Sequence, residues 1–219
     1  MPEAKPSHVV LELLTLHHDS FFAAAKFAEA TAHPVPCDTR AWSQILVSAL
    51  TGVKGIARKK GADLENGSDV KAANVWLAID TPRFNGCLKS GRKGAKGNMD
   101  SLDGMPNLFF VLWDYAATTQ NKRCRVWVVR PQKDPLFRKL CEAWYGQRDA
   151  GIIKSDNFQL HPPRNLDTNV FRNTCGNLNY PLLLCAEWND DAKGYKVVSY
   201  APDVLTAGKC TAAKESDKP

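Results

Sequence analysis

The chain has 219 residues, of which 44% are hydrophobic and 24% are charged, and its formal net charge is +6. This is the balance of an ordinary globular protein, and the length suffices for one large domain with its own core. No apolar run approaches the roughly 20 residues that a membrane span needs, and no secretory signal is expected at the amino end.

The seven cysteines indicate free thiols and not a zinc site. Their number is odd, no two form a C-x-x-C pair, and no histidine pair follows at zinc-finger spacing. We therefore expect free thiols, which are typical of a protein in the reducing cytoplasm.

The positive charge is concentrated in one stretch of the chain. Between Lys54 and Lys96 there are ten basic and four acidic residues, an excess of six that equals the excess of the whole chain. A basic stretch of this kind favours a polyanionic partner.

Two helices are predicted in the amino-terminal part. Hydrophobic periodicity predicts the first over residues 8–31, before the proline-containing segment 33–36. The second is expected to begin at a cap on Asp38 or Thr39 and to end before Gly52. We expect Gln44 to face solvent, and the apolar side of this helix to consist of Trp42, Ile45, Leu46 and Ala49.

The remainder of the chain predicts an α/β fold with a mixed central sheet flanked by helices. A strand meander is expected over 56–79, a glycine-rich loop over 80–106 and a polar, irregular segment over 155–179. The other predicted elements are strands at 108–115, 125–130, 180–188 and 195–200 and a helix at 134–147. One domain is expected over 1–205, followed by a flexible tail over 206–219.

An acid, a turn and the sequence acid-x-lysine follow one another between Asp63 and Lys71. Asp69 and Lys71 share a face if they lie on a strand, because side chains of a strand alternate. A two-residue loop at Asn66-Gly67 would turn Asp63 to the other face. We prefer a three-residue loop closed by Gly67 in the left-handed conformation, which places Asp63 opposite Asp69 with Cβ atoms about 4.5–5.5 Å apart.

Two carboxylates this close repel one another unless a cation lies between them. Mg²⁺ commonly takes one or two protein carboxylates together with water and phosphate oxygens, so Asp63 and Asp69 are its candidate ligands. The ion can polarise a phosphate, and Lys71 can position the attacking water or stabilise the developing charge. The residues therefore predict a magnesium site beside a lysine that suits a phosphate group.

This pattern resembles the PD-(D/E)XK nuclease superfamily, and in particular its type II restriction endonucleases. In that family one acid opens a strand, and a second acid, any residue and a lysine lie on the next strand. Asp63, Asp69 and Lys71 match these three positions. In the same family a polar or acidic residue on the preceding helix often supports the metal site, which is the alternative role of Gln44.

The sequence departs from the family pattern at two positions, and two of its segments are similar to one group within the family. Ala62 stands where proline is common, and the short spacing leaves Glu65 as a rival for the first acid. The segments 61–64 and 68–74 are similar to the MamI-type group of these enzymes.

The resemblance implies a restriction-endonuclease-like core, catalytic hairpin 60–79, and Mg²⁺-dependent cleavage of double-stranded DNA at a specific sequence. It also implies a homodimer in which each subunit cuts one strand. The rivals are a repair or recombination nuclease such as a junction resolvase, and a non-catalytic DNA-binding module. A binding module has no need of two facing carboxylates, which repel phosphate.

Two further segments are candidates for contact with DNA. Arginines and lysines among glycines over 83–96 suit phosphate contacts, with a solvated loop as the alternative. Segment 155–179 is rich in arginine and asparagine, which bind guanine and adenine edges, although asparagine also serves in turns. His161 is expected to be an ordinary loop histidine, with phosphate contact as the alternative. The candidate DNA-binding residues are Lys59, Lys60, Lys89, Arg92, Lys93, Lys96, Arg164, Asn169, Arg172 and Asn173.

Overall fold

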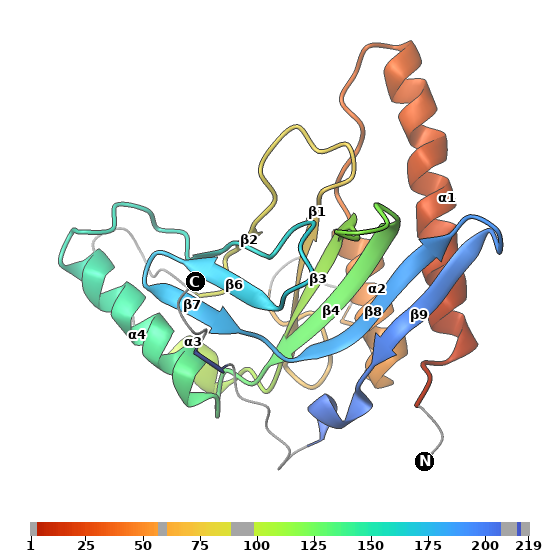
Figure 1. Ribbon diagram of the computed structural model, residues 1–219. Coiled ribbons are helices and arrows are strands. Elements are labelled where there is room, and N and C mark those ends of the chain that lie inside the picture. The colour runs from red at the N-terminus through yellow and green to blue at the C-terminus, as the bar shows by residue number, and fades with distance from the viewer. Residues whose placement is uncertain (1–3, 57–60, 89–98, 207–213, 216–219) are drawn as a thin grey trace.

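A five-stranded mixed sheet forms the centre of the protein (Figure 1). The computed structural model describes residues 4–56, 61–88, 99–206 and 214–215. The strands, in sheet order, are β1 (Asp69–Asn74), β3 (Leu108–Tyr115), β4 (Lys122–Val129), β8 (Leu182–Asn189) and β9 (Gly194–Tyr200). β1 is parallel to β3, and the other neighbours are antiparallel. The predicted class, a mixed sheet flanked by helices, is confirmed.

The sheet separates two hydrophobic cores. Helices α1 (His8–Ala30) and α2 (Arg40–Thr51) cover one face. The other face packs against α4 (Pro135–Asp149), α3 (Asp100–Asp103) and two small sheets (Figure 1). β3 serves both cores, because Phe109 and Trp113 point to the first and Phe110 to the second. Burial on both faces explains why this strand is apolar throughout.

Three strands of the small sheets lie in segment 155–179, which we expected to be irregular, and β2 (Phe84–Asn85) and α3 lie in segment 80–106, which we expected to be a loop, so both predictions are wrong in part. β2 pairs with β5 (Gln159–Leu160), and β6 (Val170–Asn173) forms a hairpin with β7 (Gly176–Asn179), beside which lies β10 (Lys214–Glu215). The sequence did not predict the β6–β7 hairpin because few of its side chains are buried, so it lacks a clear hydrophobic pattern. The buried ones are chiefly the cross-strand pair Phe171 and Leu178. A short 3₁₀ helix, η1 (Pro202–Leu205), follows β9. The predicted tail, 206–219, falls largely outside the described residues.

Both amino-terminal helices are confirmed, with one correction to the face of α2. Thr39 is its amino cap, and Gly52 ends it in the left-handed conformation at φ 71°. Its buried side is Ser43, Leu46, Val47 and Leu50. Ile45 was predicted to be in the core but is 54% exposed. Ser43 takes a core position because its hydroxyl accepts the indole N–H of Trp113 at 3.0 Å.

We expected several strands over 56–79, but the described residues of this range, 56 and 61–79, form one regular strand, β1. The chain turns immediately after it, with Leu77 at φ 52°, so the apolar run to Ile79 does not continue the strand. The six cysteines within the described ranges are free, as expected. Among the described residues, no helix is both long and apolar enough to cross a membrane.

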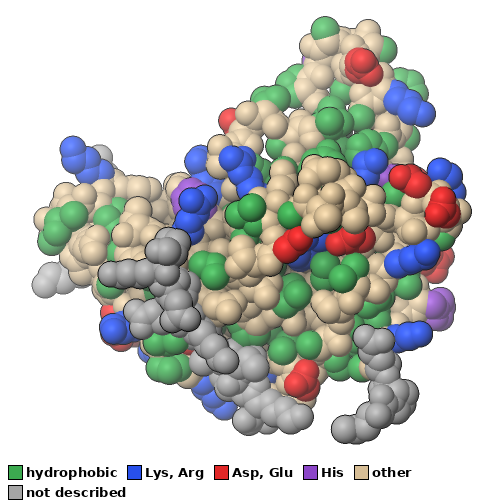
Figure 2. Space-filling model, viewed as in Figure 1, with side chains coloured by type: hydrophobic (Ala, Val, Ile, Leu, Met, Phe, Trp, Pro, Cys, Tyr) green, Lys and Arg blue, Asp and Glu red, His purple; other side chains and the backbone are tan. Residues whose placement is uncertain are grey.

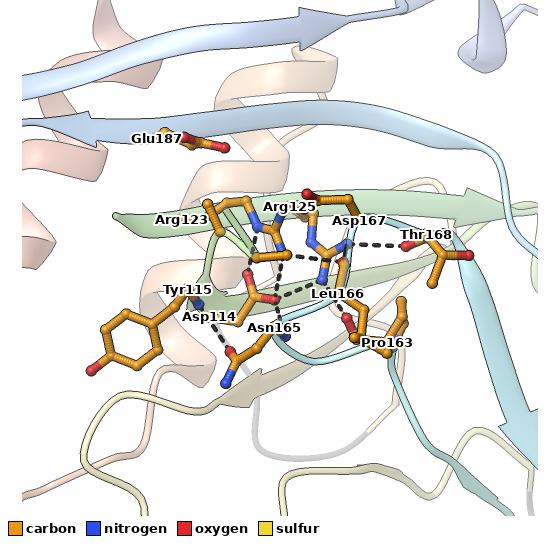
Figure 3. Close-up of polar contacts among 12 residues, drawn as sticks. Asp114, Tyr115, Arg123, Arg125, Pro163, Asn165, Leu166, Asp167, Thr168 and Glu187 are labelled. Atoms are coloured by element: carbon orange, nitrogen blue, oxygen red, sulfur yellow. Dashed lines mark hydrogen bonds and ion pairs between the residues drawn. The ribbon is translucent and has the colours of Figure 1, made fainter. Parts of the chain in front are cut away.

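A buried ion cluster attaches the segment before β6 to the central sheet (Figure 3). Asp114 of β3 is fully buried, and its Oδ2 accepts hydrogen bonds from Arg123 at 2.9 Å and Arg125 at 2.6 Å. The same oxygen accepts the main-chain N–H of Asn165 at 2.9 Å. Arg125 also donates to the carbonyl oxygens of Pro163, Leu166 and Thr168. The cluster therefore fixes the loop over 163–168, and the sequence analysis did not foresee it.

We predict that Asp114→Ala destabilises the protein by about 3–5 kcal/mol, because two buried guanidinium groups lose their shared counterion. Chemical denaturation of the variant measures this. Asp167→Ala is the matched control: its carboxylate also binds Arg123, but the side chain is 55% exposed and the loss should be at most about 1 kcal/mol. Equal losses in the two variants would show that the buried carboxylate is not the centre of the cluster.

Candidate active site

Asp69 and Lys71 lie side by side on β1, the edge strand of the sheet. Lys71 Nζ is 2.7 Å from Asp69 Oδ2, and the two side chains are 22% and 12% exposed. The shared face follows from the alternation of side chains along a strand, as predicted. The pair is therefore mostly shielded from water and still open to a ligand.

The turn before β1 has the predicted three-residue form. Gly67 is left-handed at φ 88°, its N–H donates to the carbonyl of Leu64 at 3.0 Å, and the N–H of Leu64 donates to the carbonyl of Ser68 at 3.1 Å. The expected strand pairing does not continue beyond the turn, because Leu64 forms a bridge with Gly55 and β1 pairs with β3 instead. The segment that we expected to form a hairpin is therefore a turn followed by an edge strand.

Asp63 nevertheless lies at the site, although it does not pair with Asp69 across a hairpin as we expected. Its Oδ2 accepts the main-chain N–H of Val70 at 2.8 Å. Asp69 N–H donates to the carbonyl of Asn107 next to β3, so the N–H of Val70, one residue on, points to the open edge of the sheet. The Asp63 carboxyl group thus caps this edge and lies within hydrogen-bonding reach of Asp69.

Gln44 holds the second oxygen of Asp63. Its side-chain Nε2 donates to Asp63 Oδ1 at 2.7 Å, so the expectation that Gln44 faces solvent is wrong. α2 packs beside β1 with Leu46 and Val47 buried. Gln44 lies one turn before Val47, at the border of this buried face, and its side chain reaches the site. Two donors on different elements therefore fix the Asp63 carboxyl group.

The electrostatics of the site reflect two carboxyl groups in one partly buried place. Burial and the neighbouring Asp69 raise the pKa of Asp63 to about 6, against the opposing effect of the Val70 N–H. Burial is the largest single effect on Lys71 and lowers its pKa, but the charge and the hydrogen bond of Asp69, together with its other acidic neighbours, outweigh burial and raise the pKa overall. At neutral pH the site thus has a charged lysine and an excess of negative charge that favours a cation.

A cleft of about 710 Å³ opens along the free edge of β1. Its lining is mostly polar and includes Gln44, Asp63, Asp69, Lys71, Asn74 and Arg83. Glu65, the rival first acid, is exposed at the tip of the turn and is not part of this lining. The geometry therefore favours Asp63 over Glu65.

The donors available to a metal are carboxylates. Cys87 lies close to Lys71 and Asp69, but burial raises the pKa of its thiol to about 12, so it is uncharged and a poor ligand. No group of three or more His, Cys, Asp or Glu side chains within the described residues has metal-binding geometry. Two carboxylates with water and phosphate oxygens are a set that suits Mg²⁺.

The structure separates the predicted DNA contacts into three groups. Arg164 and Arg172 are exposed. Asn169 accepts the indole N–H of Trp127 at 2.9 Å, and Asn173 donates to the carbonyl of Gln159 at 2.7 Å, so both amides have structural partners. The residues outside the described part of the chain are Lys59, Lys60, Lys89, Arg92, Lys93 and Lys96.

Comparisons with known proteins give one family. The family model described as MamI restriction endonuclease matches residues 26–191. The type II restriction enzyme MamI of Microbacterium ammoniaphilum is 32% identical over 170 residues, which are 73% of this chain and 54% of that enzyme. The chain thus spans about half the length of this relative. No solved structure matches the chain.

We predict that Asp63→Asn stabilises the metal-free protein above the Asp63 pKa of about 6 and that the difference disappears below its ordinary value of 3.8. A carboxyl group whose pKa is raised by folding disfavours the folded state when ionised, and this effect is lost once it is protonated in both states. Melting temperatures across this pH range, measured with EDTA, test it.

The amide keeps both contacts, since its oxygen can accept from Val70 while Gln44 rotates to present its own oxygen. Glu65→Gln is the control, because that exposed acid belongs to the same turn and should show no such trend. A stability difference that does not depend on pH would contradict the electrostatic origin.

Proposed function

Because the chain belongs to the MamI restriction endonuclease family, we propose that it is a type II restriction enzyme that hydrolyses double-stranded DNA at a specific sequence. The observation that supports this most directly is that Asp63, Asp69 and Lys71 line one polar cleft. The arrangement resembles the PD-(D/E)XK site, and we assign the three residues to catalysis.

The carboxylates of Asp63 and Asp69 would hold the Mg²⁺ ion. The fit rests on two carboxyl groups that line the same cleft, where burial and the neighbouring Asp69 raise the pKa of Asp63. A hard divalent cation with oxygen ligands removes this repulsion. When bound, the ion supplies charge neutralisation for the phosphate and its nucleophile.

The protein's own side chains have separate tasks around this pair. Gln44 and the N–H of Val70 hold Asp63 in one orientation through both of its oxygens. Lys71 keeps its proton at neutral pH because Asp69 lies 2.7 Å away. Its ammonium group can donate to a phosphate oxygen and stabilise the charge that develops there, or orient the attacking water.

The proposal also covers the oligomeric state of the enzyme and its place in the cell. Cleavage of both strands at a palindromic site requires two active sites, so we propose a homodimer with two-fold symmetry. We place the enzyme in the cytoplasm, where its substrate is duplex DNA and where its cysteines remain reduced.

The site assignment predicts that Asp63→Ala, Asp69→Ala and Lys71→Ala each abolish cleavage and leave the protein folded. Each side chain serves the metal or the phosphate and not the core. Glu65→Ala is the matched control and should cut normally. The assay is incubation with unmethylated phage DNA and Mg²⁺, followed by electrophoresis.

Discrete fragments from the wild type support the restriction enzyme. Cleavage of branched DNA alone would favour a junction resolvase, and a mobility shift without cleavage would favour a binding module. If Asp63→Ala cut DNA and Glu65→Ala did not, Glu65 would be the first acid of the site, and the chain would still be a nuclease. Full activity in both Asp69→Ala and Lys71→Ala would overturn the site.

Metal dependence is the next prediction. EDTA should abolish cleavage, whereas Ca²⁺ should support DNA binding with little cutting because its coordination geometry is looser. The same electrophoretic assay together with fluorescence anisotropy measures both effects. Undiminished cleavage in EDTA would contradict the role of Asp63 and Asp69 as metal ligands.

A further inference from the structure

Arg83, His161 and Arg172 form a row on neighbouring short strands, which we call the rim because Arg83 lines the cleft. His161 and Arg172 are directly opposite, since each main-chain N–H donates to the carbonyl of the other, at 2.8 and 3.0 Å. Phe84 pairs with Leu160, and continuing this antiparallel register by one residue places Arg83 opposite His161. Directly opposite residues have Cβ atoms about 4.5–5.5 Å apart and point to the same face.

The core fixes which way this row points. Each of its members is next in sequence to a side chain that is no more than 1% exposed, namely Phe84, Leu160 and Phe171. The rings of Phe84 and Phe171 stack at 5.8 Å. Because side chains alternate, the row Arg83–His161–Arg172 is turned outward. Figure 2 shows Lys and Arg side chains gathered beside a histidine on one face of the molecule.

The row has no counterion in the described part of the chain. Neither an ion pair nor a side-chain hydrogen bond is formed there by Arg83, His161 or Arg172. Burial and the charges of Arg172 and Arg83 lower the pKa of His161, which agrees with the short distances that the register implies. The row therefore presents two guanidinium groups on either side of an imidazole that is mostly uncharged at neutral pH, and this set of donors suits a bound anion.

We propose that Arg83, His161 and Arg172 form a binding site for a backbone phosphate of the DNA strand that enters the cleft. The proposal rests on the proposed function and extends it. Arg83 also lines the cleft that holds Asp63, Asp69 and Lys71, so one strand can pass from the catalytic residues to the row. Arg172 is thereby assigned to the sugar-phosphate backbone and not to a base edge.

Salt dependence separates a phosphate contact from a base contact. Each phosphate that a protein neutralises contributes about −0.9 to the slope of log K against log salt concentration. Arg83→Gln and Arg172→Gln should each make this slope shallower by about one, equally for duplexes of different sequence. Fluorescence anisotropy with duplex oligonucleotides in Ca²⁺ measures the slopes without cleavage. Arg172→Lys keeps the charge and should keep the slope.

The control is Lys196→Gln, which removes one charge from an exposed position of β9, at the opposite edge of the sheet from β1, and should leave the slope unchanged. Melting temperatures of the two arginine variants should equal or exceed that of the wild type, because repulsion within the row is relieved.

Unchanged slopes in both arginine variants would overturn the phosphate site while leaving the nuclease intact. A loss of affinity in Arg172→Gln that is confined to one sequence would do the same and would assign Arg172 to base recognition. Absence of DNA binding and cleavage by the wild type would instead refute the proposed function itself.

Discussion

The site depends on one constraint: the carboxyl groups of Asp63 and Asp69 lie close together, partly buried, at the open edge of β1, which is parallel to its neighbour β3. Among the described residues, β3 is the only strand paired with β1, so every second main-chain N–H of β1 points away from the sheet. Asp63 takes one of these donors at Val70 and a second donor at Gln44. The edge that could otherwise pair with another strand becomes a fixed support for acidic groups beside a charged lysine.

Tertiary structure holds the region around the cleft with interactions that do not take part in chemistry. The buried carboxylate of Asp114 binds two arginines, and Arg125 binds the carbonyl groups of the loop over 163–168 (Figure 3). That loop leads into β6, which presents Arg172. The rim of the cleft is thus attached to β3 and β4, and β3 is the neighbour of β1, so the rim and the edge that we propose to be catalytic are attached to the same sheet.

Like charges are brought together twice, with opposite signs. Asp63 and Asp69 form the negative group, which suits a metal ion. Arg83 and Arg172, on either side of His161, form the positive group, which in our proposal binds a phosphodiester. We expect both arrangements to oppose the stability of the free protein and binding to relieve them, which is the relation expected at functional sites. A DNA strand with its metal ion would satisfy both groups together.

The sequence by itself determined the three long helices, the long strands and the shared face of Asp69 and Lys71, because local periodicity and turn chemistry decide them. The left-handed glycine of the turn, Gly67, belongs to this class. Only the tertiary structure decided how Asp63 reaches its partner, since the chain abandons the predicted hairpin ladder and β1 pairs with a strand nearly 40 residues later. It also decided the role of Gln44 and the row at the rim, because those contacts join elements that are distant in sequence, and no local pattern encodes such distances.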